Sequence, residues 1–108
     1  MNKYYIVSIK HTHKADQYIS LWRPDNAGYC YSLEWAGKYD EALIREKPDY
    51  YNNLEDSFPV PIAVAQSIAI PPEHGNITGP VIQNNRENWR RLKRSWVDMV
   101  AIPQLVVV

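Results

Sequence analysis

Three histidines and one cysteine carry the most distinctive chemistry in this sequence. His11 and His13 are two positions apart, so in an extended segment both imidazoles would project from one face and could share a metal ion. A catalytic zinc site typically uses three protein ligands, and His74 or Cys30 would have to complete the set. Nothing in the sequence places either residue beside the pair. Solvent-exposed histidines beside a turn are therefore favoured, and no metal site is predicted.

The sequence motifs of common enzymes are missing from the chain. It contains no glycine-rich phosphate loop, no Cys-x-x-Cys pair, no His-Glu-x-x-His and no Gly-x-Ser-x-Gly. Cys30 paired with a histidine would need a third group to orient the base, and donors for an oxyanion, and none is identifiable. The acidic residues are scattered along the chain, whereas two-carboxylate chemistry needs them to converge. We therefore expect no catalytic residues and no cofactor.

A turn-forming segment with an aromatic residue on each side is the first candidate contact surface. Residues 23–28, RPDNAG, contain the residue types that fix or tolerate turn dihedrals. An arginine beside aromatic rings is typical of interface hot spots, and equally of a platform on which a nucleic-acid base stacks. A simple hairpin turn would also explain the composition. The candidate binding residues here are Trp22, Arg23, Asp25 and Tyr29.

The strongest local charge lies near the C-terminus. Five cationic residues stand within positions 86–94, where Glu87 is the only acid. On a helix, four of them fall on one side, away from an apolar stripe. Such a face is an ordinary solvated surface, a contact for an anionic protein partner, or a site for phosphate groups. The candidate binding residues on this face are Arg86, Arg90, Lys93 and Arg94.

The elements that would position the turn are three N-terminal strands. Residues 3–10 are rich in Tyr, Ile and Val with only Ser8 interrupting, which predicts a strand with much of both faces covered. Further strands are expected over 17–22 and 29–35, on either side of the turn, which gives an antiparallel meander. On the third strand, one face would carry Tyr29, Tyr31, Leu33 and Trp35.

Short helices and a short strand are expected in the middle of the chain. Asp40 can cap a helix over 41–47, which Pro48 would end. Residues 49–57 are polar and predict a surface loop. A brief strand over 58–60 would precede a helix over 62–70, with Pro61 in its first turn, and residues 81–82 could form a last short strand.

The C-terminal helix has the clearest pattern. Asn84 followed by Glu87 resembles a capping box, and Trp89, Leu92 and Trp96 form one helical stripe. The helix is expected to end before Pro103. The apolar tail over 101–108 would then add a strand to the sheet, or to a second copy in a homodimer, through residues 105–108.

Length and composition predict one domain, residues 1–108, of α+β class: a small antiparallel sheet with two or three helices. Twelve basic residues balance twelve acidic ones, which argues against a surface that attracts nucleic acid or membranes as a whole. The N-terminal sequence lacks the long apolar core of a signal peptide, and no stretch reaches membrane-spanning length. We therefore expect a cytoplasmic protein that does not contact membranes.

Four segments, in order, resemble a set of small uncharacterised proteins of bacteria and their phages. They are 6–12 (IVSIKHT), 21–29 (LWRPDNAGY), 36–39 (AGKY) and 79–89 (GPVIQNNRENW), within a likeness that spans residues 4 to about 92. The resemblance implies phage or prophage ancestry and the host cytoplasm, with no known activity. Small phage proteins often bind host machinery, including defence systems. The expected function is therefore a non-enzymatic accessory protein that binds and inhibits or modulates a host protein. The alternative is a module that binds a nucleotide or nucleic acid.

Overall fold

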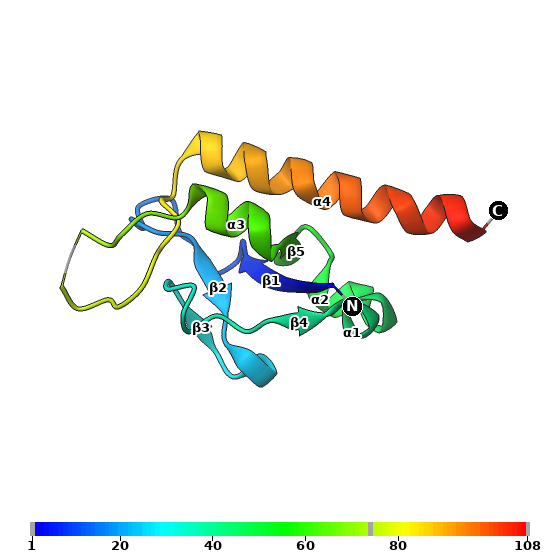
Figure 1. Ribbon diagram of the computed structural model, residues 1–108, viewed down its shortest axis with the longest axis horizontal. Coiled ribbons are helices and arrows are strands. Elements are labelled where there is room, and N and C mark those ends of the chain that lie inside the picture. The colour runs from blue at the N-terminus through cyan, green and yellow to red at the C-terminus, as the bar shows by residue number, and fades with distance from the viewer. Residues whose placement is uncertain (1, 74, 108) are drawn as a thin grey trace.

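The sheet is built around β1 (Lys3–Ser8), which pairs antiparallel with three other strands (Figure 1). The computed structural model describes residues 2–73 and 75–107, the side chains of 97–107 excepted. The strand order is β3-β2-β1-β4, and β5 pairs with the other side of β1. The predicted α+β class and N-terminal meander are confirmed. The other strands are β2 (Ser20–Trp22), β3 (Tyr29–Cys30), β4 (Tyr39–Asp40) and β5 (Ser57–Pro61).

Both faces of the sheet are covered, as the composition of β1 predicts. Tyr5 and Val7 lie in a largely aliphatic core, covered by α3 (Ile62–Ile68) and α4 (Arg86–Val107). We call this side of the sheet the aliphatic face. The other side, the aromatic face, lies toward α1 (Glu41–Glu46) and α2 (Pro48–Tyr51). Its buried cluster consists of Tyr4, Ile6, Trp22, Tyr39, Ile44 and Tyr51.

The third strand is much shorter than the predicted 29–35. β3 ends at Cys30, and the chain turns because the Ser32 hydroxyl and carbonyl accept the Glu34 and Trp35 N–H groups. The Leu33 N–H donates to the Pro80 carbonyl. The predicted shared face is therefore wrong. Leu33 is buried in the core, whereas Trp35 is 54% exposed.

Prolines explain two further corrections. α1 ends at Glu46, close to the predicted 47. Pro48 then begins α2, which continues to Tyr51 and replaces the start of the predicted 49–57 loop, because a proline without N–H suits a first helical turn. Asp40 precedes α1 without making a side-chain cap hydrogen bond. The 58–60 strand is longer than predicted, since β5 pairs only with β1 and an edge strand tolerates prolines at 59 and 61.

α4 differs from prediction at both ends. Its N-terminus is capped by Asn85, whose Oδ1 accepts the Asn88 N–H at 2.8 Å, one position later than expected. Its backbone continues through Pro103, so the predicted end before Pro103 and the strand at 105–107 are wrong; Val108 lies outside the described residues. Extending a formed helix needs no partner outside the helix itself, whereas a strand needs a sheet edge. None of the described helices has the length and apolar composition needed to cross a bilayer.

Candidate functional site

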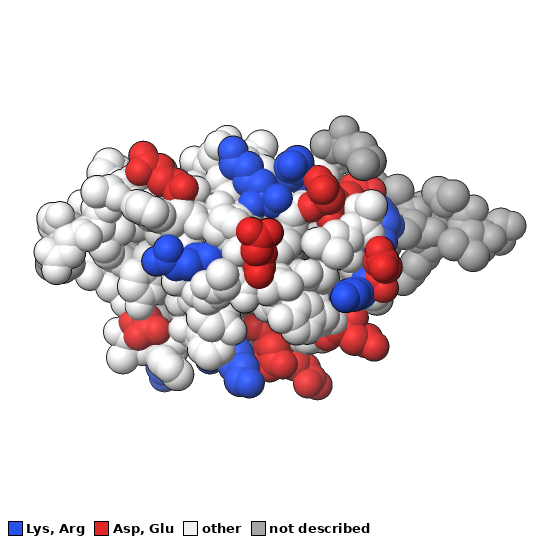
Figure 2. Space-filling view, turned by 90° about the horizontal axis from the view of Figure 1, so that it is seen from below, with Lys and Arg blue, Asp and Glu red and all other residues white. Residues whose placement is uncertain are grey.

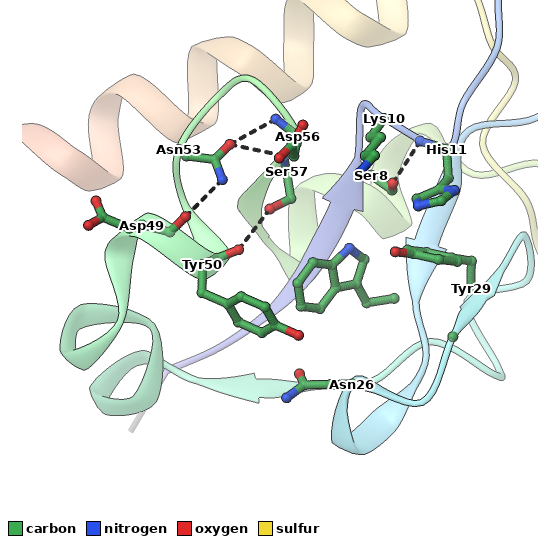
Figure 3. A pocket seen from close by; sticks show the side chains of 12 residues that line it. Ser8, Lys10, His11, Asn26, Tyr29, Asp49, Tyr50, Asn53, Asp56 and Ser57 are labelled. Atoms are coloured by element: carbon green, nitrogen blue, oxygen red, sulfur yellow. Dashed lines mark hydrogen bonds between the residues drawn. The ribbon is translucent and has the colours of Figure 1, made fainter.

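A polar pocket of about 230 Å³ opens at one end of the aromatic face (Figure 3). Three stretches of chain surround it: the end of β1 with the following loop, the turn between β2 and β3, and the segment from α2 to β5. Its twelve lining residues are Ser8, Lys10, His11, Trp22, Asn26, Gly28, Tyr29, Asp49, Tyr50, Asn53, Asp56 and Ser57. Two predicted binding residues, Trp22 and Tyr29, are among them.

A row of buried serines forms the polar end of the aromatic face. In the register of the sheet, Ser8 lies directly opposite Ser20 on β2 and Ser57 on β5. Opposed residues of paired strands share a face, so the three hydroxyls lie on the same side of the sheet as Tyr4 and Ile6. All three serines are at most 5% exposed. Two of them, Ser8 and Ser57, line the pocket.

Trp22 is the centre of an aromatic cluster rather than an exposed contact residue. It is 9% exposed, and its ring packs against four tyrosines at centroid distances of 5.3 to 6.4 Å. Edge-to-face packing of this kind adds to the stabilisation from burial. The four rings around Trp22 are Tyr29, Tyr39, Tyr50 and Tyr51.

The walls of the pocket are half-exposed rings. Tyr29 is 42% exposed and stacks on His11 at a centroid distance of 3.9 Å, so His11 packs on a ring beside the pocket. Tyr50 is 52% exposed and closes the side toward α2. In Figure 3, the side chains of Tyr29 and Tyr50 approach the pocket from opposite sides.

The turn that carries the predicted residues is held in place by the side chain of Tyr39 on β4. Its core is a short 3-10 helix, η1 (Pro24–Asn26), in which Asp25 is exposed with a φ of 59°. The buried Tyr39 hydroxyl donates to the Arg23 carbonyl and accepts the Asn26 N–H at 3.0 Å. A Cβ at Gly37 would lie 2.8 Å from the Pro24 backbone, so this close approach requires glycine. The turn is therefore rigidly tied to β4.

Arg23 joins two exposed aromatic residues on the outside of the turn. Its Nε donates to the Tyr29 carbonyl at 3.0 Å, and its guanidinium lies 5.8 Å from the centre of the Trp35 ring. We call Arg23, Tyr29, Trp35 and Tyr50 together the exposed aromatic surface. Figure 2 shows acidic and basic side chains interspersed on the side of the molecule away from α4, so the charge drawn there is mixed.

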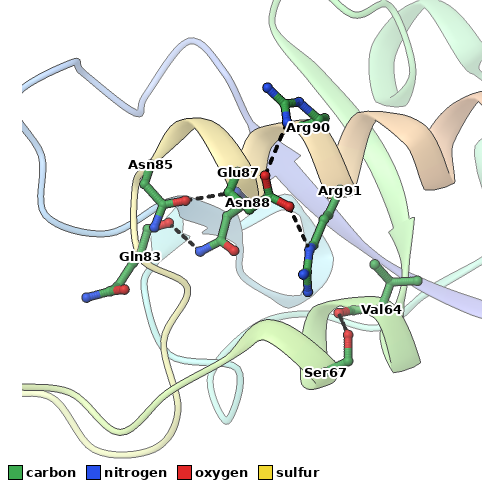
Figure 4. Close-up of polar contacts among 8 residues, drawn as sticks. All are labelled: Val64, Ser67, Gln83, Asn85, Glu87, Asn88, Arg90 and Arg91. Atoms are coloured by element: carbon green, nitrogen blue, oxygen red, sulfur yellow. Dashed lines mark hydrogen bonds and ion pairs between the residues drawn. The ribbon is translucent and has the colours of Figure 1, made fainter.

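The predicted basic face lies on α4, on the opposite side of the sheet from the turn (Figure 1). Its four residues, Arg86, Arg90, Lys93 and Arg94, are all exposed. Glu87 pairs with Arg90 at 3.3 Å and with Arg91 at 3.2 Å, which lowers the local positive charge (Figure 4). The predicted stripe is confirmed: Leu92 is fully buried, and Trp89 and Trp96 pack against the core. The two groups of predicted binding residues thus belong to separate surfaces.

In the described part of the chain, Cys30 and the His, Asp and Glu side chains form neither an activated thiol nor a cluster of metal ligands. Burial raises the pKa of the half-buried Cys30 thiol, which disfavours the nucleophilic thiolate. Across residues 2–73 and 75–96, no three His, Cys, Asp or Glu side chains come together as a metal site. His74 lies outside the described residues.

Several pocket residues were not predicted from the sequence. Tyr50 and Ser57 fell in a presumed loop, and Lys10 was assigned to a strand. Ser8 gave the one usable signal, because it interrupts an otherwise apolar strand. A polar side chain in such a strand must find a partner or reach a cavity.

No family model, no curated protein and no solved structure matches this chain. The resemblance to small phage and bacterial proteins therefore stays a prediction.

Proposed function

We propose that this protein is a non-enzymatic accessory protein that binds a partner protein through the exposed aromatic surface and modulates that partner. The observation that carries the proposal is the exposure of three large rings near the turn: Arg23 contacts Tyr29 and Trp35, and Tyr50 lies across the pocket from Tyr29. Tyr29, Trp35 and Tyr50 account for three of the four large hydrophobic residues that are exposed among the described residues. Exposed aromatic rings beside an arginine are the composition of interface hot spots.

The rigidity of this surface supports the same function. The Trp22 cluster fixes Tyr29 and Tyr50 from behind, and the Tyr39 hydroxyl fixes the turn. A surface that is already ordered loses little conformational entropy on binding. That the partner is a bacterial host protein, such as a defence component, rests on the resemblance alone.

The alternative, a module for a nucleotide or nucleic acid, has support from the stacked His11 and Tyr29 rings beside the pocket. Base stacking on such rings is a common mode of recognition. Against it, the pocket lining contains no arginine, and Lys10 is its only Lys or Arg side chain.

Capture of a partner from bacterial lysate by tagged full-length variants tests the proposal. We expect Tyr29→Ala with Tyr50→Ala to lose a partner that the wild-type protein retains, while circular dichroism shows an intact fold. The matched control is Arg90→Glu with Arg94→Glu on α4, which should retain that partner. Loss of the partner by the α4 variant alone contradicts the proposal. A nucleotide that co-purifies, seen as a raised ratio of absorbance at 260 to 280 nm, would favour the alternative.

A further inference from the structure

The pocket contains an indole N–H that has no acceptor among the described residues. Trp35, Trp89 and Trp96 donate their indole N–H groups to Thr78, Asn84 and Asn52, but no described residue accepts the N–H of Trp22. The Trp22 side chain is 9% exposed. Every fully buried polar side-chain atom in the described part has a hydrogen-bond partner, so the unpartnered Trp22 Nε1 is not fully buried. Its indole nitrogen must therefore reach open space, and the cavity that Trp22 lines is the polar pocket.

A second donor without an acceptor lies on the same face of the sheet. The Ser8 hydroxyl accepts the His11 N–H at 3.0 Å, but none of the described residues accepts its own proton. The other serines of the row differ, since Ser20 donates to the His11 carbonyl and Ser57 to the Tyr50 carbonyl. Ser8 is 1% exposed and lines the pocket. A third group, the exposed Lys10 ammonium, forms no ion pair within the described part of the chain.

Donors that face a cavity without acceptors select the chemistry of the ligand. An indole N–H and an ammonium can only donate, so a ligand that satisfies them must present hydrogen-bond acceptors. An ionised carboxylate has only acceptor sites, and its hydrogen bonds to such groups are charge-assisted. A volume of about 230 Å³ is below that of most drug-sized sites and suits a side chain better than a large cofactor.

We infer that the pocket receives a carboxylate group, supplied by a Glu or Asp side chain of the partner protein. The inference rests on the proposed function, because the pocket opens between Tyr29 and Tyr50 of the exposed aromatic surface. An acidic side chain that enters there accepts from Trp22, Ser8 and Lys10, while the neighbouring rings contact the rest of the partner. Hot spots lie in well-packed pockets surrounded by contacts that exclude water, and the rings around this pocket can supply such contacts.

Two carboxylates of the protein itself also line the pocket and set a condition on this assignment. Asp49 turns its carboxylate away from the other labelled side chains in Figure 3. Asp56 is exposed, and its carbonyl accepts the Ile9 and Lys10 N–H groups. Asp56 forms no ion pair with a described cation, so its negative charge weakens the attraction for an incoming carboxylate. Replacing it by Asn should strengthen binding.

Nuclear magnetic resonance of the indole N–H groups tests the inference with acetate as the probe. The ¹⁵N-labelled full-length protein is titrated with sodium acetate at constant ionic strength. We expect the Trp22 signal, identified by its absence in Trp22→Phe, to move downfield and saturate. The other three signals should not move, because those groups already donate within the protein. Sodium chloride and methylammonium chloride should leave all four unchanged.

Variants of the donors and of the opposing acid sharpen the result. Ser8→Ala and Lys10→Gln should each weaken acetate about tenfold, and Asp56→Asn should tighten it. A response to methylammonium instead of acetate, or no saturable shift of the Trp22 signal, overturns the carboxylate assignment.

The two proposals fail in different ways. Acetate binding without a captured partner overturns the protein-binding function and identifies a site for a small carboxylic acid. With a captured partner, Trp22→Phe should weaken capture, whereas Trp89→Phe, on α4 and outside both the pocket and the exposed aromatic surface, should retain it. Equal capture by both variants overturns the inference and leaves the proposed function standing.

Discussion

The two faces of the sheet are built from different residue types, and we expect them to contribute differently to stability and to binding. Of the twelve residues in the buried cluster of the aliphatic face, only Tyr5 and Phe58 are aromatic. The cluster of the aromatic face has six residues, of which four are Tyr or Trp. Aliphatic side chains carry no polar atoms and can pack against α3 and α4 without leaving a cavity. Tyrosine and tryptophan each carry one polar atom that must find a partner or reach water.

Most of the polar atoms in the cluster of the aromatic face have hydrogen-bond partners within the protein. The Tyr4 hydroxyl donates to Glu41, that of Tyr39 to the Arg23 carbonyl and that of Tyr51 to Asn26. The Trp22 N–H has no such acceptor among the described residues and borders the pocket. We therefore expect the aliphatic face to contribute most of the stability, and the aromatic face to carry the proposed binding.

The largest expected effect is a loss of stability on the aliphatic face. Phe58 is fully buried there and packs against Trp89 at a centroid distance of 6.3 Å. We expect Phe58→Ala to lower the free energy of unfolding by about 3–5 kcal/mol, because a cavity remains where the ring was. Leu43→Ala, at a residue that is 36% exposed, is the control and should cost less than about 1 kcal/mol. Urea denaturation measures both. If Phe58→Ala lowers the free energy of unfolding by less than about 1 kcal/mol, the aliphatic face does not supply most of the stability.

Two tyrosine hydroxyls on the aromatic face give the next effect. Tyr39→Phe removes the donor to the Arg23 carbonyl and the acceptor for the Asn26 N–H, and should cost about 1–3 kcal/mol. Tyr50→Phe removes a hydroxyl that has no partner within the described part of the chain, so its unfolding midpoint in urea should not move. If the two variants are equally stable, the hydrogen bonds of the Tyr39 hydroxyl do not stabilise the turn.

The elements with strong local signals were predicted from the sequence. The apolar composition of residues 3–10 predicted a strand covered on both faces, and the spacing of Trp89, Leu92 and Trp96 predicted the packed side of α4. The first signal is composition and the second is side-chain periodicity, and neither depends on distant parts of the chain. The turn between Trp22 and Tyr29 is also a local feature, and its composition drew attention to these two residues, which line the pocket.

The pocket itself could not be predicted, because it depends on strand register. Ser8 and Ser57 are 49 positions apart in the chain and become neighbours only through the pairing of β1 with β5. Prolines at 59 and 61 made β5 appear shorter than it is, and so concealed that register. The separation of the turn from the α4 face is likewise a property of the folded sheet, because no local pattern records which side of it a helix covers.

The smallest expected effect is a pH dependence where α1 meets the aromatic face. The Tyr4 hydroxyl donates to Glu41 at 2.8 Å, and this hydrogen bond, with help from Arg45, holds the pKa of the Glu41 carboxyl below its usual value. A carboxyl with a lowered pKa in the folded state stabilises the fold above its unfolded pKa, and that contribution is lost as the pH falls through the folded value. Unfolding free energies measured between about pH 6 and pH 3 should therefore fall less steeply for Tyr4→Phe than for the wild type. Glu46→Gln, at an exposed acid on the same helix, should keep the wild-type slope. An unchanged slope in Tyr4→Phe would mean that this contact contributes nothing to the stability of the aromatic face, which would then depend on ring packing alone.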